Sequence, residues 1–190
     1  MFAHKKNYYL IIENTKDINL KNIKIRNKFS IIYRNHKNNE NRYELFKFSK
    51  MCKLKAIKFY VANNFKLALH LNSSGVYLSA SNYSLKYLTY KNSKFEIIGA
   101  AHNLREIRKK MIQGCNSILL SKLFFVNYDR KASYLGVIKF NNYQRIFNNL
   151  IPLGGIKLKN LNSLNIINGK GFALLSEVKK KPANIINRLF

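Results

Sequence analysis

The feature that most constrains the fold is a series of eight short apolar segments spread along the whole chain. Their starts lie roughly 18 to 33 residues apart, a spacing that suits one strand followed by one crossover helix. They are mostly apolar and do not alternate strictly with polar residues, as is typical of strands covered on both faces. The segments are Tyr8–Ile12, Phe29–Tyr33, Ile57–Val61, Gly75–Leu78, Phe95–Ile98, Ser117–Phe124, Leu150–Leu153 and Phe172–Leu175.

Helical patterns occupy several of the intervening segments. The clearest is 41–55, in which less polar residues recur at helical spacing. A second helix is predicted over 103–113, because Asn103 is a favourable N-cap, Glu106 follows three residues later and Gly114 lies just past the end. A short helix is predicted over 160–167, and a last one from Glu177 to the C-terminus.

Alternating strands and helices predict an α/β fold with a parallel sheet. Residues 1–190 are expected to form one domain, a small single-domain (β/α)8 TIM barrel with short crossover helices. The main structural alternative is a flavodoxin-like open sheet, which needs only five strands.

The last two strand–helix junctions carry residues that favour a phosphate site. Gly154 and Gly155 follow the seventh apolar segment, and Ser176 follows the eighth. A strand that enters a helix through glycine or serine directs backbone N–H groups and the positive end of the helix towards one point. In closed (β/α)8 barrels the loops after the seventh and eighth strands commonly bind phosphate. The alternatives are a tight turn for the glycines and a plain N-cap for Ser176.

The net charge of +27, from 35 Lys and Arg against 8 Asp and Glu, allows two interpretations. A strongly basic domain can bind nucleic acid or an anionic membrane. Here, however, the lysines are scattered over every segment, and no nucleic-acid-binding motif accompanies them. The sequence therefore favours a small anionic ligand over nucleic acid. A basic nucleic-acid-associated protein remains a third hypothesis, which requires one contiguous Lys/Arg face away from the barrel mouth.

Cysteine usage and hydropathy indicate a cytoplasmic protein with no membrane partner. Cys52 and Cys115 have neither disulfide-scaffold nor metal-knuckle spacing, and both are expected to pack in the core. The sequence predicts no secretory signal and no transmembrane span, and it leaves the oligomeric state open.

Five ordered segments resemble those of the thiamine phosphate synthase and TenI family. The resemblance extends roughly from Tyr8 to Val178 and is carried by Val61–Leu69, Ser74–Ser79, Ile97–Leu104, Pro152–Ile156 and Gly171–Ser176. It implies a (β/α)8 fold and a role in thiamine biosynthesis. Synthases of this family join a pyrimidine diphosphate to a thiazole phosphate with Mg²⁺ and release pyrophosphate. TenI members include a tautomerase that aromatises the thiazole phosphate.

The diphosphate and Mg²⁺ positions implied by the resemblance match only in part. Of the family's Gln-x-Arg-x-Lys pattern after the second strand, Arg34 is retained. Asn63 and Asn82 stand where the family has Mg²⁺-binding aspartates. Because amide oxygens are poor replacements for carboxylates, Mg²⁺ is a possible cofactor by resemblance only, and a Mg²⁺-independent reaction or plain binding is favoured.

The remaining candidate residues lie at other strand ends. Gly154, Gly155 and Ser176 match the family positions that hold the thiazole phosphate, and Lys122 could contact phosphate or pyrophosphate or be an ordinary solvated lysine. His102 is the candidate catalytic base, since it directly precedes the helix capped by Asn103. A histidine packed at a strand end is the alternative.

The predicted function is thus a thiamine-biosynthesis protein similar to thiamine phosphate synthase, with a small phosphorylated heterocycle as ligand. The alternatives are a TenI-like thiazole-phosphate tautomerase and a barrel that binds the phosphate ligand without catalysis.

Overall fold

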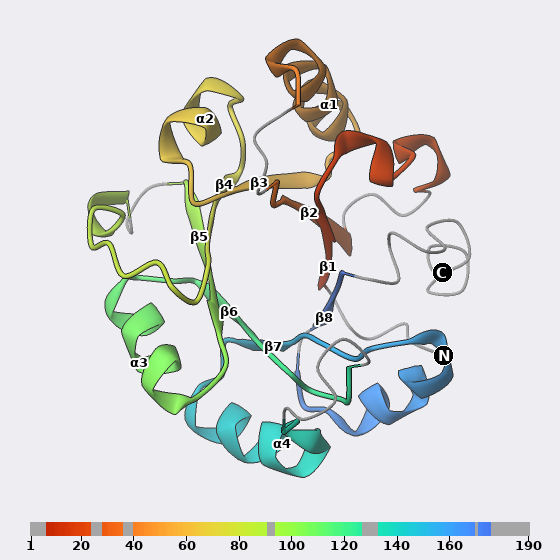
Figure 1. Cartoon of the computed structure of the whole chain (residues 1–190), viewed down its shortest axis with the longest axis vertical. Helices are drawn as coiled ribbons and strands as arrows, with labels where there is room; N and C mark the ends of the chain where they lie inside the picture. Colours follow the sequence, from red (N-terminus) through yellow and green to blue (C-terminus); the bar gives the residue numbers. More distant parts are fainter. Residues whose placement is uncertain are drawn as a thin grey trace.

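The computed structural model of the chain is a ring of parallel strands surrounded by helices (Figure 1). It describes residues 7–23, 28–35, 40–90, 94–126, 133–169 and 171–175. The strands form one 8-stranded sheet in the order β7-β6-β5-β4-β3-β2-β1-β8. They are β1 (Asn7–Ile12), β2 (Phe29–Tyr33), β3 (Lys58–Ala62), β4 (Gly75–Leu78), β5 (Glu96–Ala101), β6 (Ser117–Leu120), β7 (Leu150–Pro152) and β8 (Gly171–Leu174).

The two edges of this sheet meet, so the predicted barrel is confirmed and the open-sheet alternative is not. Leu153, directly after β7, forms a parallel bridge to Ala173 of β8. β1 pairs with β2 on one side and with β8 on the other, with Ile12 opposite Tyr33 and Tyr8 opposite Phe172. All strands therefore end at the same rim, where βα loops carry the functional residues of such barrels.

The outer layer combines α-helices with 3₁₀ segments. The α-helices are α1 (Arg42–Leu54), α2 (Phe65–His70), α3 (Leu104–Ile112) and α4 (Gly136–Ile146), and the 3₁₀ segments are η1 (Thr15–Asp17), η2 (Leu20–Asn22), η4 (Leu88–Tyr90) and η5 (Leu158–Ile166). α1 buries Leu45, Phe48 and Cys52, which recur at helical spacing, and the Asn41 side chain caps its first turn. Among the described helices, none is long and apolar enough to cross a membrane.

Two apolar layers explain why the strands are apolar without alternation. In β1, Tyr8, Leu10 and Ile12 belong to the layer between strands and helices. Tyr9 and Ile11 belong to the layer inside the barrel. Both faces of each strand are thus removed from water, and this requires an apolar residue at nearly every position.

The sequence predictions were wrong at some element boundaries. The sixth strand ends at Leu120 rather than Phe124, because the chain turns into the loop in which Leu123 and Phe124 bond to Leu153 and Gly154. The predicted helix at 160–167 is a 3₁₀ segment, and α4 was not predicted. The predicted helix from Glu177 and the candidate residue Ser176 lie outside the described residues.

Candidate functional site

A pocket of about 600 Å³ lies at the rim, where β2 and β3 end. The chain places Arg34 directly after β2, with its backbone N–H bonded to the carbonyl of Ile12, and Asn63 directly after β3. Three cations and no carboxylate occur among the described lining residues, which are Arg34, Asn35, Ala62, Asn63, Asn64, Phe65, Lys66 and Lys86. We call this the rim pocket. Its charge suits an anion with several oxygens.

Arg34 contacts the barrel interior through its guanidinium, and its Nε is buried. Its guanidinium lies beside the hydroxyl of Tyr77, a buried residue of β4. Burial raises the pKa of Tyr77, whereas the charge and hydrogen bond of Arg34 act to lower it. The Nε of Arg34 is buried and has no hydrogen-bond partner among the residues that the structure describes. A buried donor without a partner costs free energy.

Asn63 and Asn82, which the sequence resemblance predicts at the family's metal positions, are hydrogen-bonded to each other. Asn63 Oδ1 accepts from Asn82 Nδ2 at 3.0 Å and from the backbone N–H of Ser79 at 3.0 Å. Asn82 Oδ1 accepts from the backbone N–H of Ser84 at 3.1 Å. We call the direct contact between Asn63 and Asn82 the amide clasp. It joins the loop after β3 to the loop after β4.

The residues at these positions do not fit Mg²⁺. Mg²⁺ requires hard, preferably anionic oxygen ligands that are free to point at the ion. Both amide oxygens already accept from N–H groups, and Asn63 and Asn82 carry no charge. Within the described part of the chain, no three His, Cys, Asp or Glu side chains cluster so that they could hold a metal ion. Glu40 lines an adjoining depression, where Thr15 N–H donates to its Oε1 at 2.9 Å.

The diglycine lies at a different part of the rim and packs against the loop after β6. Gly154 and Gly155 both have positive φ, +92° and +69°. The Gly154 carbonyl accepts from Phe124 N–H at 3.0 Å, and the Gly155 carbonyl accepts from Asn160 Nδ2 at 2.8 Å. A Cβ on Gly154 would lie 3.2 Å from the Lys122 Cα, so the backbone of Lys122 lies beside the diglycine. Conformation and close approach thus already require glycine here.

His102 lies at the end of β5 and is held by the first turn of α3. Its Nδ1 is 2.9 Å from Glu106 Oε2, which also accepts the His102 backbone N–H at 2.8 Å. The Asn103 side chain accepts from Glu106 N–H at 2.9 Å, which confirms the predicted cap. The side chain of His102 is 52% exposed. When Nδ1 carries the proton and donates to Glu106, Nε2 is left as the acceptor, as a base requires.

Glu106 is expected to make the stability of the protein depend on pH. Partial burial acts to raise its pKa, but the hydrogen bonds and charge from His102 outweigh burial and lower it. The carboxylate therefore stabilises the fold above its ordinary pKa of 4.5, and this contribution is lost as the pH falls through the folded-state pKa. We expect Glu106→Gln to cost about 0.5 to 1 kcal/mol at neutral pH and nothing in acid, measured by urea unfolding. Glu44→Gln, at an exposed first-turn site of α1, is the control. Equal losses in both variants, or a loss that persists in acid, would contradict this assignment.

Several site residues were not predicted. Tyr77, Lys66 and Lys86 contribute to the rim pocket or its support, but nothing in the sequence separates these two lysines from the other basic residues. The predicted candidates fall into three groups. Arg34 and Asn63 share the rim pocket, Lys122 lies with Gly154 and Gly155, and His102 lies at the end of β5.

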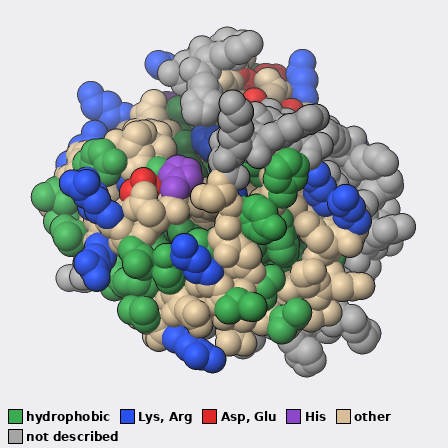
Figure 2. All heavy atoms as spheres, turned by 60° about the horizontal axis from the view of Figure 1, so that its bottom comes forward, with side chains coloured by type: hydrophobic (Ala, Val, Ile, Leu, Met, Phe, Trp, Pro, Cys, Tyr) green, Lys and Arg blue, Asp and Glu red, His purple; other side chains and the backbone are tan. Residues whose placement is uncertain are grey.

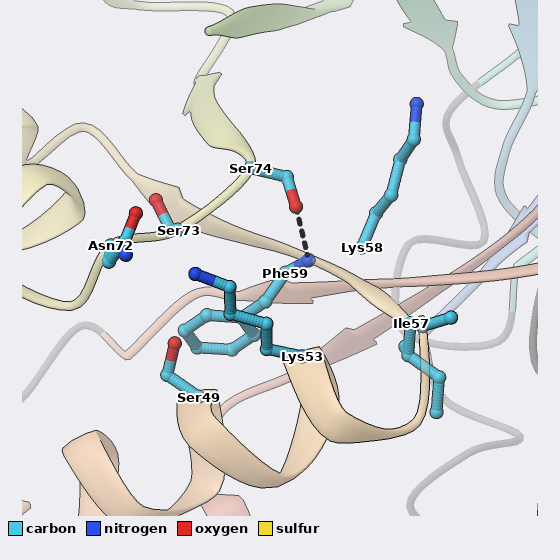
Figure 3. A pocket seen from close by; sticks show the side chains of 9 residues that line it. Ser49, Lys53, Ile57, Lys58, Phe59, Asn72, Ser73 and Ser74 are labelled. Atoms are coloured by element: carbon cyan, nitrogen blue, oxygen red, sulfur yellow. Dashed lines mark hydrogen bonds between the residues drawn. The ribbon is translucent and has the colours of Figure 1, made fainter. Parts of the chain in front are cut away.

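A second pocket, of about 340 Å³, lies at the opposite end of β3 (Figure 3). Lys53 of α1, Lys58 at the start of β3 and Asn72–Ser74 before β4 line it. Lys58 forms an ion pair with Glu96, and the Ser74 hydroxyl accepts the Phe59 N–H at 3.2 Å. These contacts support the amino-terminal end of the barrel, where residues contribute to stability rather than catalysis.

Closed parallel strands, crossover helices and a cationic pocket at the carboxyl rim define a small (β/α)8 barrel. The family model described as thiamine monophosphate synthase matches residues 4–178. The chain therefore belongs to the thiamine monophosphate synthase family.

The chain is also similar to one curated relative and to several solved structures. A thiamine-phosphate synthase from Flavobacterium johnsoniae is 27% identical over 122 residues, which cover 60% of this chain and 58% of that relative. The match thus spans less than two thirds of the relative's length. A structure of thiamine phosphate pyrophosphorylase from Pyrococcus furiosus superposes with a TM-score of 0.70 over 100% of both chains at 13% identity. Phosphoribosyl anthranilate isomerase from Thermotoga maritima gives 0.65 at 14% identity, over 93% of this chain and 91% of that one. At such identities the two structures support the fold alone.

Proposed function

We propose that the protein acts in thiamine biosynthesis as a thiamine-phosphate-synthase-like enzyme, joining a pyrimidine diphosphate to a thiazole phosphate. The observation that carries this proposal is the rim pocket, which Arg34, Lys66 and Lys86 line together with no carboxylate among the described lining residues. Family membership supplies the reaction class. In this proposal the rim pocket receives the diphosphate.

The proposed reaction forms one bond and breaks one. The thiazole nitrogen attacks the methylene carbon of the pyrimidine, and the C–O bond to the diphosphate breaks with both electrons leaving on oxygen. The thiazole becomes a thiazolium cation and pyrophosphate is released. Arg34, Lys66 and Lys86 stabilise the negative charge that develops on the leaving group. The diglycine and Lys122 are the proposed contacts of the thiazole phosphate.

An assay with both half-molecules tests the proposal. The purified chain is mixed with the pyrimidine diphosphate and the thiazole phosphate, and thiamine phosphate and pyrophosphate are measured with EDTA and, separately, with Mg²⁺. We expect the same yield of thiamine phosphate and of pyrophosphate in EDTA as in Mg²⁺. Product that appears only with Mg²⁺ would uphold the synthase but show that the fit argument for Asn63 and Asn82 is wrong. Binding of both half-molecules without product would identify a ligand-binding barrel, and no binding would refute the proposed function.

A second candidate reaction is the aromatising tautomerisation of the thiazole phosphate. It is favoured by one observation, the pairing of His102 Nδ1 with Glu106, which leaves Nε2 to abstract a proton. If this reaction occurs, His102→Ala should slow aromatisation of the non-aromatic precursor at least about a hundredfold, followed by ultraviolet absorbance. His70→Ala, at the end of α2, should leave the rate unchanged. Equal turnover in the two variants would exclude the base role.

The surface gives less support to nucleic-acid binding. On the face shown in Figure 2, Lys and Arg side chains stand singly among apolar and uncharged ones rather than in one stripe. The cations of the rim pocket lie at the barrel mouth, not on a separate face. Competition between tRNA and thiazole phosphate in a thermal-shift assay distinguishes these ligands, since we expect only the thiazole phosphate to raise Tm.

A further inference from the structure

Lys110 of α3 is a fully buried cation whose side chain is 0% exposed. Its ammonium donates to the backbone carbonyls of Ser79 and Asn82 at 2.7 and 2.6 Å and to the Gln113 side-chain oxygen at 2.9 Å. No carboxylate is among these acceptors. Buried lysines are rare unless paired, so a lysine surrounded by loop carbonyls requires an explanation other than general solubility.

The geometry requires the charged form of Lys110. Three oxygen acceptors within 2.9 Å need three N–H donors, and only the ammonium supplies three. Burial lowers the pKa of Lys110, while Cys115 and Glu106 act to raise it. The surrounding structure makes room for the side chain. A Cβ on Gly99 of β5 would lie 2.9 Å from the Lys110 Cδ, so the aliphatic stem passes directly over this glycine.

The carbonyls that Lys110 binds belong to the loop that forms the amide clasp. Ser79 and Asn82 bracket the turn after β4, and Gln113 Nε2 adds bonds to the carbonyls of Asn82 and Ser84 at 3.0 and 2.8 Å. On its other side, the same loop bonds to Asn63 through the Ser79 N–H and Asn82 Nδ2. Asn63 lines the rim pocket. A continuous chain of hydrogen bonds therefore runs from Lys110 to the ligand side.

We propose that the Lys110 ammonium is a built-in cation that fixes the β4 loop and, through the amide clasp, positions Asn63 in the rim pocket, so that a phosphate-bearing anion binds there without a divalent metal ion. Lys110 is a positioning residue, because its contacts are to the loop and not to the ligand. The inference rests on the proposed function only for the identity of the anion.

Pyrophosphate is the probe that tests this inference, measured by isothermal titration calorimetry in EDTA. The wild-type chain is expected to bind it. Lys110→Met should weaken binding about tenfold, because a charge-assisted hydrogen-bond network that orders the loop is lost. Arg108→Met, an exposed charge on the same helix, should bind as the wild type does. Hydrogen exchange of amides 79–84 should be faster in Lys110→Met only, a change that simple loss of charge would not produce.

Two results would overturn the inference: wild-type binding that requires Mg²⁺, or a folded Lys110→Met chain that binds as tightly as the wild type. If Lys110→Met does not fold, Asn82→Ala is measured instead, because it removes the amide clasp and leaves the buried lysine in place. Weaker pyrophosphate binding by Asn82→Ala would then support the inference, and unchanged binding would overturn it. The double variant Asn63→Asp/Asn82→Asp should bind pyrophosphate only with Mg²⁺, since two unscreened carboxylates replace the clasp. This experiment measures pyrophosphate binding, whereas the coupling assay measures thiamine phosphate formation. The inference about Lys110 can therefore fail while the proposed function holds, and the proposed function can fail while the inference holds.

Discussion

Replacing Arg34 with Met is expected to weaken pyrophosphate binding about a hundredfold and to reduce thiamine phosphate formation at least as much. The physical reason is the loss of a fork-shaped cation that is partly buried and held by Tyr77 at the pocket. Arg34→Lys keeps the charge but cannot donate two parallel hydrogen bonds, so an intermediate loss is expected. Calorimetry and the coupling assay measure the two effects.

The control for Arg34 is Arg145→Met, which removes one charge from the exposed side of α4. It should change neither quantity by more than about twofold, because exposed charges act over a screened distance. If both arginine variants lose the same small amount, the whole positive surface attracts the anion, and the rim pocket has no special role.

Gly155→Ala is expected to destabilise the protein by about 2 to 4 kcal/mol, the largest stability effect predicted here. Gly155 has φ +69°, which disfavours any L side chain, and its Cβ would collide with backbone atoms of Phe124 and lie 2.6 Å from the Phe125 carbonyl oxygen. Backbone atoms cannot rotate away as a side chain can, so the loop after β6 must move. Thermal and urea unfolding measure the cost.

Gly136→Ala separates the two causes. Gly136 has nearly the same φ, +72°, but a Cβ there would meet nothing within 4 Å. This variant should therefore lose only the conformational term, about 1 kcal/mol. A similar loss at both glycines would mean that the diglycine is not packed tightly against the loop after β6.

The fold was predictable because each strand can be recognised from its own apolar residues. A closed sheet buried on both faces makes each strand continuously apolar, so residues such as Tyr8 to Ile12 could be recognised without their partners. Strand ends were harder. In the segment 117–124, apolar residues resume at Leu123 after Ser121 and Lys122, because Leu123 packs in the core from a loop. Hydropathy alone does not distinguish such a loop residue from a strand residue.

The candidate site was predictable only where the chain order fixes it. Arg34 and Asn63 follow neighbouring strands, so their meeting at one pocket follows from the topology. Lys66, Lys86 and Lys110 look alike in the sequence, yet the first two line the pocket and the third is buried. The amide clasp was not predicted either. Asparagine in place of an expected aspartate indicates that a carboxylate is missing, but it does not indicate which contact the asparagine makes.

A crystal structure of the protein with pyrophosphate in the presence of Mg²⁺ tests the central claim most directly. The expected result is diphosphate in the rim pocket, with an oxygen accepting from the Arg34 guanidinium and with the hydrogen bond between Asn63 and Asn82 unbroken. Diphosphate bound elsewhere, or a magnesium ion coordinated by Asn63 and Asn82 in place of their mutual bond, would contradict it.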